Sequence, residues 1–372
     1  MPISKPSPYD VIIVGAGVNG CACAYFLGKS ALRVALIDRE GIAAGGSGAA
    51  GAFISPKFSK GGPLKEIMAQ AHTEALDFYA TDFPNHALFR PLLHIANSPA
   101  ESEKLAVYKL STELSFEEIP ELVRQAVVAD AFENESIYLS RGAIIDAKGV
   151  CRAMAKGSDF FCIDVKTPIY DEAEKLWKID GLEARNLIVT TGAYPKILPS
   201  DSVKLRAIWG HRIDIKTSTE VPCILHHYVS VSPSVSEGTI AIGATHDVHY
   251  NPFDKVPYDI QTGRMTLLEK ASKTLKLNNI EFLADYMGLR SGTHDYFPIC
   301  GPLVDEETTR TASANGCAYY PNAWMVNGSG GYGFVLAPYL AKRLAEHLTS
   351  AVDLDPALSP ARFWFRSIKR QS

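Results

Sequence analysis

The first apolar segments of the chain follow the order strand, helix, strand. Residues 9–14 form a short run rich in Val and Ile, whose β-branched side chains favour an extended strand. Residues 18–27 carry small and apolar side chains that suit a helix, and residues 32–37 form a second apolar run that ends at Asp38. The pattern therefore predicts a βαβ unit at the start of the chain.

Helical and strand-like patterns alternate further along the chain. Apolar residues recur at helical spacing over 63–79 and over 147–156, and a buried strand is predicted at 186–190. Between 206 and 290, several alternating runs and one long helix over 259–277 are typical of an antiparallel sheet covered by a helix. We therefore expect an α/β protein, α+β overall, with a Rossmann-like domain and an antiparallel-sheet domain. The other predicted elements are strands over 89–95, 142–145, 160–165, 176–179, 212–216, 224–231 and 239–242, and helices from Pro99, over 121–128 and over 334–348.

Composition narrows the class of protein. The 372 residues are enough for about two domains, and 37 Lys and Arg against 41 Asp and Glu give a net charge of −4. This balance excludes a uniformly basic nucleic-acid coat and a disordered polyelectrolyte, while a local basic patch is compatible with it. Seven cysteines are an odd number and include no C-x-x-C pair, which favours reduced thiols in a cytoplasmic protein.

The uncharged stretch 11–28 is long enough to be mistaken for a membrane span. Gly15, Gly17 and Gly20 interrupt it, and Lys5 is the only charged residue before Asp10. We therefore expect neither a signal peptide nor a transmembrane helix, and no membrane partner.

A glycine pattern lies at the turn between the first predicted strand and helix. Gly15, Gly17 and Gly20 form G-x-G-x-x-G, which permits a tight turn, close approach of a pyrophosphate and close packing of helix and strand. The helix N-terminus would face the anion. Asp38 ends the second strand, where a carboxylate can accept both ribose hydroxyls. The unit predicts a dinucleotide site but does not distinguish NAD from FAD.

A second uncharged segment, Gly45–Gly51, follows shortly after Arg39. It consists only of Gly, Ser and Ala, so its backbone N–H groups could approach a phosphate or a flat ring. A flexible surface loop explains the same composition, and the spacing alone does not decide between them.

Several segments, in a fixed order, resemble those of a known family. They are Asp10–Gly20, Asp38–Arg39 with Gly46–Gly48, Phe160–Phe161 with Val165, Thr190–Tyr194, Gly288–Asp295 with Pro298 and Gly301, and Asn327–Phe334. Together they resemble the D-amino-acid oxidase family of flavoenzymes. The resemblance implies the two-domain fold of that family and FAD as the cofactor. It also implies that FAD is noncovalent, because Ser291 and Gly292, and not a Cys, follow Arg290.

The resemblance also implies roles for individual residues. Asp38 would hold the adenosine ribose, Val165 would meet the adenine through its backbone, and Gly330–Phe334 would line the pyrimidine edge of the flavin. A Gly-rich turn that opens a helix presents N–H groups and a positive dipole end, which suit an anionic ring. The expected FAD-binding residues are Gly15, Gly17, Val18, Asn19, Gly20, Asp38, Arg39, Gly46, Ser47, Gly51, Ala52, Val165, Thr191, Gly192, Arg290, Gly328, Gly330, Gly331, Tyr332, Gly333 and Phe334.

Two subgroups of this family are similar to the chain. The glycine-oxidase type is similar at Gly288–Asp295. The FAD-oxidase half of the bifunctional enzyme that matures the carboxymethylaminomethyl group of tRNA wobble thiouridine is similar there and at Pro56–Lys60, at Arg206 with Gly210, and at Ile242–Asp247. We favour the second subgroup, because Pro56–Lys60 and Gly243–Asp247 lie outside the flavin site. The chain departs from it at Ala49–Gly51 and Ser329–Gly330, and no methyltransferase half is present.

Both subgroups act on a glycine unit, so the resemblance implies an amine oxidoreductase. A hydride would pass from carbon to flavin N5, and water would hydrolyse the imine to glyoxylate and a shortened amine. Arg290 and Tyr332 are the candidate catalytic residues: the guanidinium of Arg290 would grip the substrate carboxylate with two hydrogen bonds, and Tyr332 would shape the pocket. The partner is then tRNA or a small glycine-type amine. The alternatives are a free small-amino-acid oxidase or dehydrogenase, and a non-catalytic flavoprotein that binds RNA or another partner.

Two further constellations have simpler interpretations. His246 and His249 flank Asp247 without another ligand nearby in the sequence, so we expect no metal. We also expect no DNA partner. The C-terminal segment is basic and could touch RNA phosphate or form a solvated helix, through Arg362, Arg366, Lys369 and Arg370.

The motifs also predict how the domains divide the chain. Gly15, Val165 and Gly330 must meet at one flavin, so the domains are interleaved. We expect an FAD-binding domain made of 1–70, 140–205 and 295–360, a substrate-binding domain made of 71–139 and 206–294, and a basic tail at 361–372.

Overall fold

The computed structural model describes residues 7–58, 62–194, 196–311 and 316–368. The chain forms two compact units. The first comprises Met1–Gly45, Lys148–Ala207 and Arg290–Ser372, and the second comprises Gly46–Ala147 and Ile208–Leu289. Each unit is therefore assembled from separate stretches of sequence.

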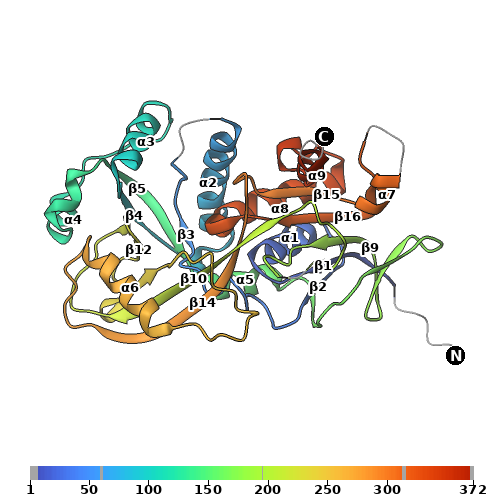
Figure 1. Cartoon of the computed structure of the whole chain (residues 1–372), viewed down its shortest axis with the longest axis horizontal. Helices are drawn as coiled ribbons and strands as arrows, with labels where there is room; N and C mark the ends of the chain where they lie inside the picture. The colour runs from blue at the N-terminus through green and yellow to red at the C-terminus, as the bar shows by residue number, and fades with distance from the viewer. Residues whose placement is uncertain (1–6, 59–61, 195, 312–315, 369–372) are drawn as a thin grey trace. The chain divides into compact units, whose positions relative to one another are not determined.

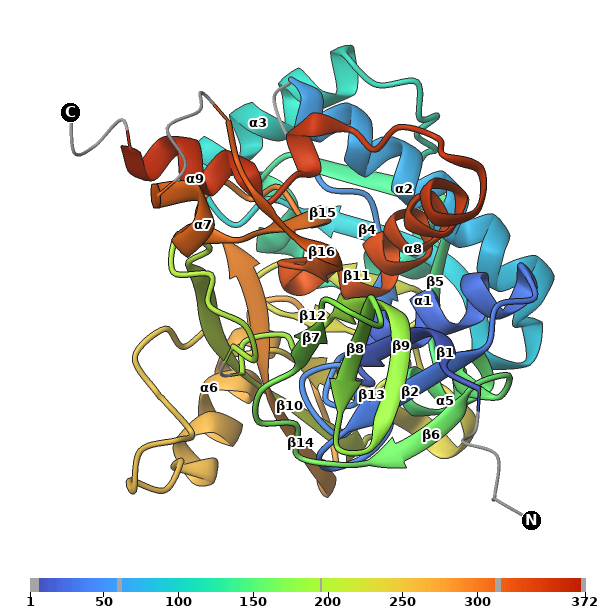
Figure 2. The ribbon, with the colours of Figure 1, turned by 90° about the vertical axis from the view of Figure 1, so that its right-hand side faces the viewer.

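The first unit is built on a sheet with parallel central strands. Its strand order is β15-β16-β9-β1-β2-β6, with β8 beside β9 and β7 beside β8. Strand β1 lies between β2 and β9, parallel to both, and Figure 2 shows β9, β1, β2 and β6 side by side. The strands are β1 (Tyr9–Val14), β2 (Val34–Asp38), β6 (Asp159–Cys162), β7 (Ile169–Asp171), β8 (Leu176–Ile179), β9 (Leu182–Val189), β15 (Ile299–Val304) and β16 (Tyr319–Asn327).

Helices α1 (Val18–Lys29) and α8 (Gly333–Ser350) pack against each other in this unit (Figure 1). Ile12, Ile37, Leu187 and Met325, from four neighbouring strands, belong to one buried core. The remaining helices are α5 (Ala147–Ala155), α7 (Glu306–Thr311), α9 (Ala361–Ile368) and the short 3-10 helices η4 (Gly330–Tyr332) and η5 (Pro356–Leu358). The predicted strand, helix and strand at 9–14, 18–27 and 32–37 are confirmed, with small shifts of their ends.

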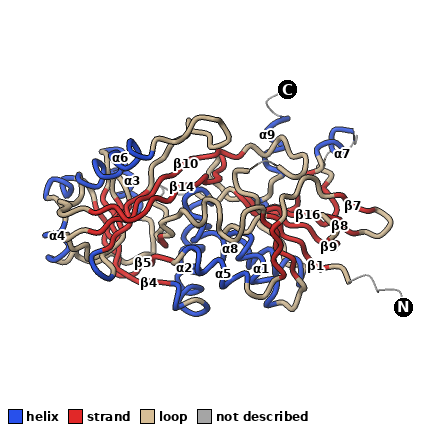
Figure 3. The backbone as a smooth tube through the Cα atoms, turned by 90° about the horizontal axis from the view of Figure 1, so that it is seen from below, coloured by secondary structure: helices blue, strands red, loops and turns tan. Residues whose placement is uncertain are grey.

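The second unit is built on a sheet in the order β14-β10-β13-β12-β11-β4-β5-β3. Antiparallel pairs prevail, as expected, but β11 runs parallel to β4. Ile213, Ile242 and Leu267 share a buried core, which joins the sheet to helix α6; Figure 3 shows α3, α4 and α6 in blue beside the red strands. The elements are β3 (Phe53–Ile54), α2 (Pro63–Asp82), η1 (Pro84–His86), β4 (Ala87–Ile95), α3 (Pro99–Leu110), α4 (Glu121–Ala126), η2 (Ala129–Glu133), β5 (Ser136–Ile145), β10 (Leu205–Lys216), β11 (Ile224–His226), β12 (Ser230–Val231), η3 (Ser236–Gly238), β13 (Thr239–Gly243), α6 (Ile260–Ser272) and β14 (Glu281–Thr293).

Some predicted elements were wrong in extent. The run 224–231 was expected to be one strand, but the His227 N–H donates to the Val229 carbonyl (3.3 Å) and reverses the chain between β11 and β12. The helix expected over 259–277 ends at Ser272, and Leu275 instead forms a β-bridge with Val127. Strands β3, β7, β14, β15 and β16 were not predicted.

The two units also differ in their bounds from the expected domains. Residues 46–70 were assigned to the FAD-binding domain, whereas the structure groups them with the second unit, where Phe53 of β3 pairs with Ile144 of β5. The expected basic tail is helical over 361–368 and buries Phe363 and Trp364.

All seven cysteines are unbridged. Among the described helices, none combines the length and apolar character that a membrane crossing requires.

A buried histidine of the second unit makes its stability sensitive to acid. Nδ1 of His226 lies 2.7 Å from the Ser230 Oγ, while Nε2 is buried without a hydrogen-bond partner among the described residues. Burial, with a smaller contribution from His94, lowers the pKa of His226 from 6.5 to about 3. The unfolded chain therefore binds a proton at this residue between pH 6.5 and pH 3 and the folded chain does not.

We predict that acidification destabilises the protein partly through His226. Since the unfolded state binds more protons, the free energy of unfolding falls as pH falls, by about 2 kcal/mol between about pH 7 and about pH 5 for this one residue. His226→Gln should remove that part of the decrease in urea unfolding measured at the two pH values. An identical decrease in the variant and the wild type would contradict the prediction.

Candidate functional site

The glycine pattern forms the expected turn between β1 and α1. Gly15 has a φ of 107°, and a Cβ there would lie 2.5 Å from the Thr190 carbonyl oxygen. A Cβ on Gly20 would lie 1.9 Å from the Gly15 carbonyl oxygen. Neither position accepts a side chain without movement of backbone, so the glycines bring α1, the loop and the end of β9 into close contact.

The N-terminus of α1 has the character of an anion site. Gly17 is its N-cap and makes no side-chain capping hydrogen bond, and the first turn contains no acidic residue. Backbone N–H groups and the helix dipole at such an end favour a negatively charged ligand.

Asp38 lies at the carboxyl end of β2, next to this loop. Its carboxylate accepts hydrogen bonds from the backbone N–H groups of Ala16 (2.8 Å), Glu40 (2.9 Å) and Gly41 (3.1 Å). A carboxylate offers about four acceptor positions, so three are in use within the protein. Asp38 therefore fixes the glycine loop. The sequence predicted a ribose contact for this residue and did not predict this second role.

Arg39 and Val165 lie near the same strand end. The guanidinium of Arg39 is 4.3 Å from the centre of the Tyr194 ring and 2.9 Å from Glu40. Ile163 continues past β6 by donating its N–H to the Asp38 carbonyl (3.0 Å), and the Val165 side chain packs against the core of the unit. The backbone of this segment thus runs beside Asp38.

A buried amide, that of Asn327, joins three of the predicted motifs. Its Nδ2 donates to the Gly192 carbonyl (3.0 Å), and its Oδ1 accepts from the Ser291 hydroxyl (2.9 Å) and the Gly328 N–H (2.8 Å). Asn327 is 1% exposed, so these hydrogen bonds, and not water, satisfy its amide. The sequence places Asn327 at the start of a motif but gave its side chain no role, because a lone Asn before a glycine turn is common and its partners are distant in the chain.

The Gly-rich turn after Asn327 also contacts α1. The Asn19 Nδ2 lies 3.3 Å from the Ser329 Oγ, and Ser329 forms a β-bridge with Gly292. Gly328 has a φ of 73°, and a Cβ there would lie 2.6 Å from the Thr293 Cγ2. A Cβ on Gly333 would lie 3.2 Å from Val18 Cγ1.

The turn leads into α8, whose N-terminus resembles that of α1. Tyr332 is the N-cap without a side-chain capping hydrogen bond, and the first turn again lacks acidic residues. Gly330 has a φ of 57°, Gly331 is exposed, and Phe334 is buried. The first unit therefore places two helix N-termini of the same anion-binding character next to one another.

Arg290 lies on β14, two residues before Gly292. It is half-buried, and burial lowers the pKa of its guanidinium. The Ser291–Asn327 hydrogen bond and the Gly292–Ser329 bridge connect the end of β14 to the Gly-rich turn, so the backbone position of Arg290 is fixed relative to that turn.

Two candidate RNA contacts have structural partners. Arg362 Nε donates to Asp295 Oδ2 (3.0 Å), Arg362 Nη2 donates to the Phe297 carbonyl (2.8 Å), and Arg366 pairs with the same carboxylate. The Arg362 side chain is 11% exposed, so it is not part of a solvated helix face. Lys369 and Arg370 lie outside the described residues, as do Ser59 and Lys60 of the motif at 56–60.

The second Gly-rich loop belongs to the second unit from Gly46 onward. A Cβ on Gly288 would lie 2.8 Å from the Gly46 Cα, and a Cβ on Gly51 would lie 2.5 Å from the Phe53 ring. Ala50 donates its N–H to the Ser47 carbonyl (3.2 Å), and the Ala52 carbonyl accepts from Ile145 (3.0 Å). The loop is therefore held tightly, not a flexible surface loop.

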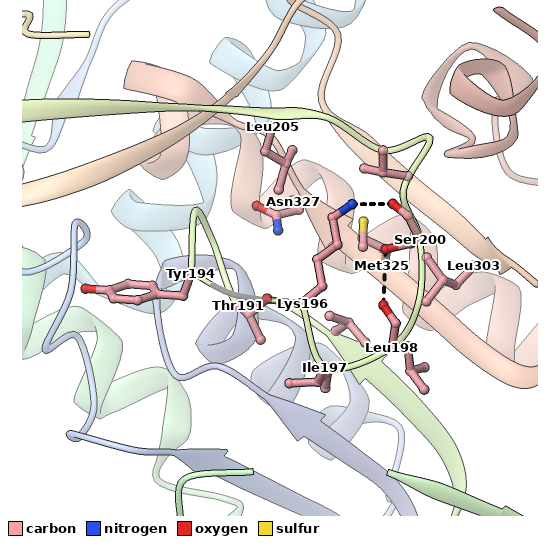
Figure 4. A pocket seen from close by; sticks show the side chains of 12 residues that line it. Thr191, Tyr194, Lys196, Ile197, Leu198, Ser200, Leu205, Leu303, Met325 and Asn327 are labelled. Atoms are coloured by element: carbon pink, nitrogen blue, oxygen red, sulfur yellow. Dashed lines mark hydrogen bonds between the residues drawn. The ribbon is translucent and has the colours of Figure 1, made fainter. Parts of the chain in front are cut away.

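A small pocket of the first unit adjoins Thr191 and Asn327 (Figure 4). About half of its lining residues are aliphatic, and its charged member Lys196 is turned toward the Ser200 carbonyl, to which its ammonium donates. Burial lowers the pKa of Lys196. The pocket is lined by Val189, Thr191, Tyr194, Lys196, Ile197, Leu198, Ser200, Val203, Leu205, Leu303, Met325 and Asn327, of which only Thr191 is among the expected FAD-binding residues.

These features together fit a dinucleotide with an anionic ring system. Two uncapped helix N-termini without acidic residues suit a pyrophosphate and a negatively charged ring, and the glycines leave room where a Cβ would collide. Among the described residues, no group of His, Cys, Asp and Glu could hold a metal ion.

The chain is similar to curated proteins over almost its whole length. It is 26% identical over 404 residues to the tRNA 5-methylaminomethyl-2-thiouridine biosynthesis bifunctional protein MnmC of Leptospira interrogans, covering 97% of this chain and 61% of that protein. It is 24% identical to the protein of the same name from Legionella pneumophila, covering 99% of this chain and 59% of that protein. The chain therefore spans about three fifths of the length of these relatives.

Solved structures share the fold. Glycine oxidase from Bacillus cereus gives a TM-score of 0.73 at 16% identity, covering 93% of this chain and 96% of that chain. L-α-glycerophosphate oxidase from Mycoplasma pneumoniae, solved with FAD bound, gives 0.72 at 17% identity, covering 95% and 98%. The model of the FAD dependent oxidoreductase (DAO) family matches residues 10–347, which include both helix N-termini and the end of β14, so the chain belongs to this family and FAD is its cofactor.

Proposed function

We propose that the chain oxidises the C–N bond of a glycine-type secondary amine. The observation that carries the proposal is the position of Arg290, whose strand is joined through Ser291 and Gly292 to the turn that opens α8. A half-buried guanidinium close to a site for an anionic ring can hold a planar carboxylate with two hydrogen bonds, which fixes both its position and its rotation.

The favoured substrate is the carboxymethylaminomethyl group of uridine or thiouridine in tRNA. The MnmC relatives are named for biosynthesis of tRNA 5-methylaminomethyl-2-thiouridine, and a carboxymethylamino group is an N-substituted glycine. A free small amino acid is the second candidate, which the structural likeness to glycine oxidases supports.

The residues of the chain would act mainly by binding and orientation. Bound FAD supplies the acceptor for a hydride that leaves the carbon next to the amine. We propose that Arg290 holds the substrate carboxylate and so aims this C–H bond, and that Tyr332 shapes the pocket. The expected FAD-binding residues of both Gly-rich loops and of the turn before α8 would hold the cofactor. Loss of the hydride leaves an iminium, water adds to its carbon, and cleavage of the C–N bond gives glyoxylate and the shortened amine.

Anaerobic reduction of the flavin tests the substrate. We predict that tRNA carrying the carboxymethylaminomethyl group bleaches the visible flavin absorbance with release of glyoxylate, and that tRNA lacking the group does not. Glycine, sarcosine and D-alanine are assayed in parallel. Bleaching by the free amino acids alone would replace the tRNA substrate by the second candidate, and no bleaching by any of them would favour a non-catalytic flavoprotein.

Two glycines of α1 form a matched pair for the FAD site. We predict that Gly20→Ala abolishes FAD binding, because its Cβ would lie 1.9 Å from the Gly15 carbonyl oxygen. Gly28 lies on the same helix, and a Cβ there would have no atom within 4 Å, so Gly28→Ala should bind FAD normally and gain about 1 kcal/mol of stability. Equilibrium titration with FAD and thermal unfolding measure the two effects. Normal binding by Gly20→Ala would disprove the assigned role of the loop.

The role of Arg290 is tested through the substrate carboxylate. We predict that Arg290→Leu lowers kcat/KM for a glycine-type amine by about 100-fold or more, because two charge-assisted hydrogen bonds are lost. The wild type should strongly prefer sarcosine to sarcosine amide if free amino acids are turned over, and the variant should lose this preference. With tRNA, the same comparison uses the carboxymethyl group and its amide. A preference that survives in Arg290→Leu would assign the carboxylate to another residue.

A further inference from the structure

Arg212 lies on β10 in the second unit, and its guanidinium has two defined partners, an aromatic ring and a backbone carbonyl. The guanidinium carbon is 3.9 Å from the centre of the Tyr286 ring, and Nη1 donates to the Ala50 carbonyl. The side chain is 14% exposed. Arg212 therefore joins strands β10 and β14 to the middle of the Gly-rich loop of this unit.

A glycine on the neighbouring strand leaves room for the Arg212 side chain. Gly243 is its cross-strand partner on β13, and a Cβ there would lie 2.7 Å from the Arg212 Cγ. Nε of Arg212 lies 3.3 Å from Asp214 Oδ1, yet each of these two atoms is buried without a hydrogen bond among the described residues. The directed hydrogen bond of the guanidinium thus goes to the loop, and Asp214 lies beside it as a counter-charge that also hydrogen-bonds to Tyr286.

Residues 50–52 of the loop form a strained segment that is held by a hydrogen bond at each end. Ala52 has a φ of 49°, a conformation that costs an L-residue about 1 kcal/mol or more, and such residues persist only where their surroundings fix them. Ile145 donates to the Ala52 carbonyl (3.0 Å) on one side of Gly51, and Arg212 donates to the Ala50 carbonyl on the other. Gly288 leaves space for the start of the loop beside Gly46.

We propose that Arg212 is a positioning residue for FAD binding: it fixes the carbonyl of Ala50 and thereby orients the N–H of Gly51, which belongs to the same planar peptide group, for the cofactor. The inference rests on the proposed role of this loop in FAD binding and does not depend on the substrate. A planar guanidinium can stack on Tyr286 and donate along its edge at the same time, which an ammonium cannot do.

The test measures the affinity for FAD and the environment of the bound flavin, which its visible circular dichroism reports. Arg212→Met should raise the Kd for FAD about 10-fold or more, since a hydrogen bond from a charged group is lost. At saturating FAD it should also change the visible circular dichroism of the flavin, which a loss of stability alone would not do. Arg212→Lys, which can reach the Ala50 carbonyl without stacking on Tyr286, should give an intermediate Kd.

Arg264 provides the matched control in the same unit. Its guanidinium also lies over an aromatic ring, 4.8 Å from the centre of Phe282, and donates to Asp285 Oδ1 (2.9 Å), but these partners lie on β14 and not in the loop. Arg264→Met should therefore lower the thermal stability without changing the Kd for FAD or the flavin spectrum.

Each outcome decides the proposal. An Arg212→Met variant with the Kd and dichroism of the wild type overturns it, and so does an equal loss of FAD affinity in Arg264→Met. Where Arg212→Met does not fold, Arg212→Lys decides: a weakened Kd with altered dichroism supports the proposal, and wild-type values overturn it. A wild type that binds FAD but is reduced by no amine defeats the proposed function and leaves the Arg212 comparison intact.

Discussion

The first unit depends on one buried amide. Asn327 has to satisfy a carbonyl after β9, a hydroxyl at the end of β14 and an N–H in its own turn, all away from water. A buried polar group left without its partner costs about 1–3 kcal/mol, so each of these three segments is stabilised by the presence of the other two. Ser329, in the same turn, contacts both Asn19 of α1 and Gly292 of β14, and these contacts help to set the N-termini of α1 and α8 relative to each other.

The glycines supply the complementary constraint. Gly15, Gly20 and Gly328 stand where a Cβ would lie within 3 Å of a carbonyl oxygen or a methyl group. Hydrogen bonds determine which segments meet in this unit, and the absence of side chains determines how closely they approach. An anion site made of backbone N–H groups needs both, since N–H groups reach a ligand only where nothing projects in front of them.

Local signals in the sequence predicted the parts of the structure that local physics controls. Periodicity and glycines a few residues apart predicted the order β1, α1, β2. They also predicted that Asp38 lies at the end of a strand. The sequence could not reveal that Asp38 binds the N–H of Ala16, or that Asn327 binds Gly192, because those partners are brought together only by the folded chain. Arg212 was missed for the same reason: a single Arg in an alternating run carries no signal until Ala50 and Tyr286 lie beside it. Arg362 shows the reverse error, in which a basic run suggested a surface role and the fold buries the side chain against Asp295. Arg366 pairs with the same carboxylate but keeps about half of its side chain exposed.

The order of segments has a consequence for folding during synthesis. Strand β9 lies between β1 and β16 in the sheet, and its pairing with β16 joins Leu187 to Ala323. The ribosome must therefore make the whole second stretch of the second unit, Ile208–Leu289, before the first unit can complete its sheet and place Asn327. During that interval one edge of β9 lacks its final neighbour, and apolar strands with unpaired edges are the parts of a nascent chain that associate wrongly.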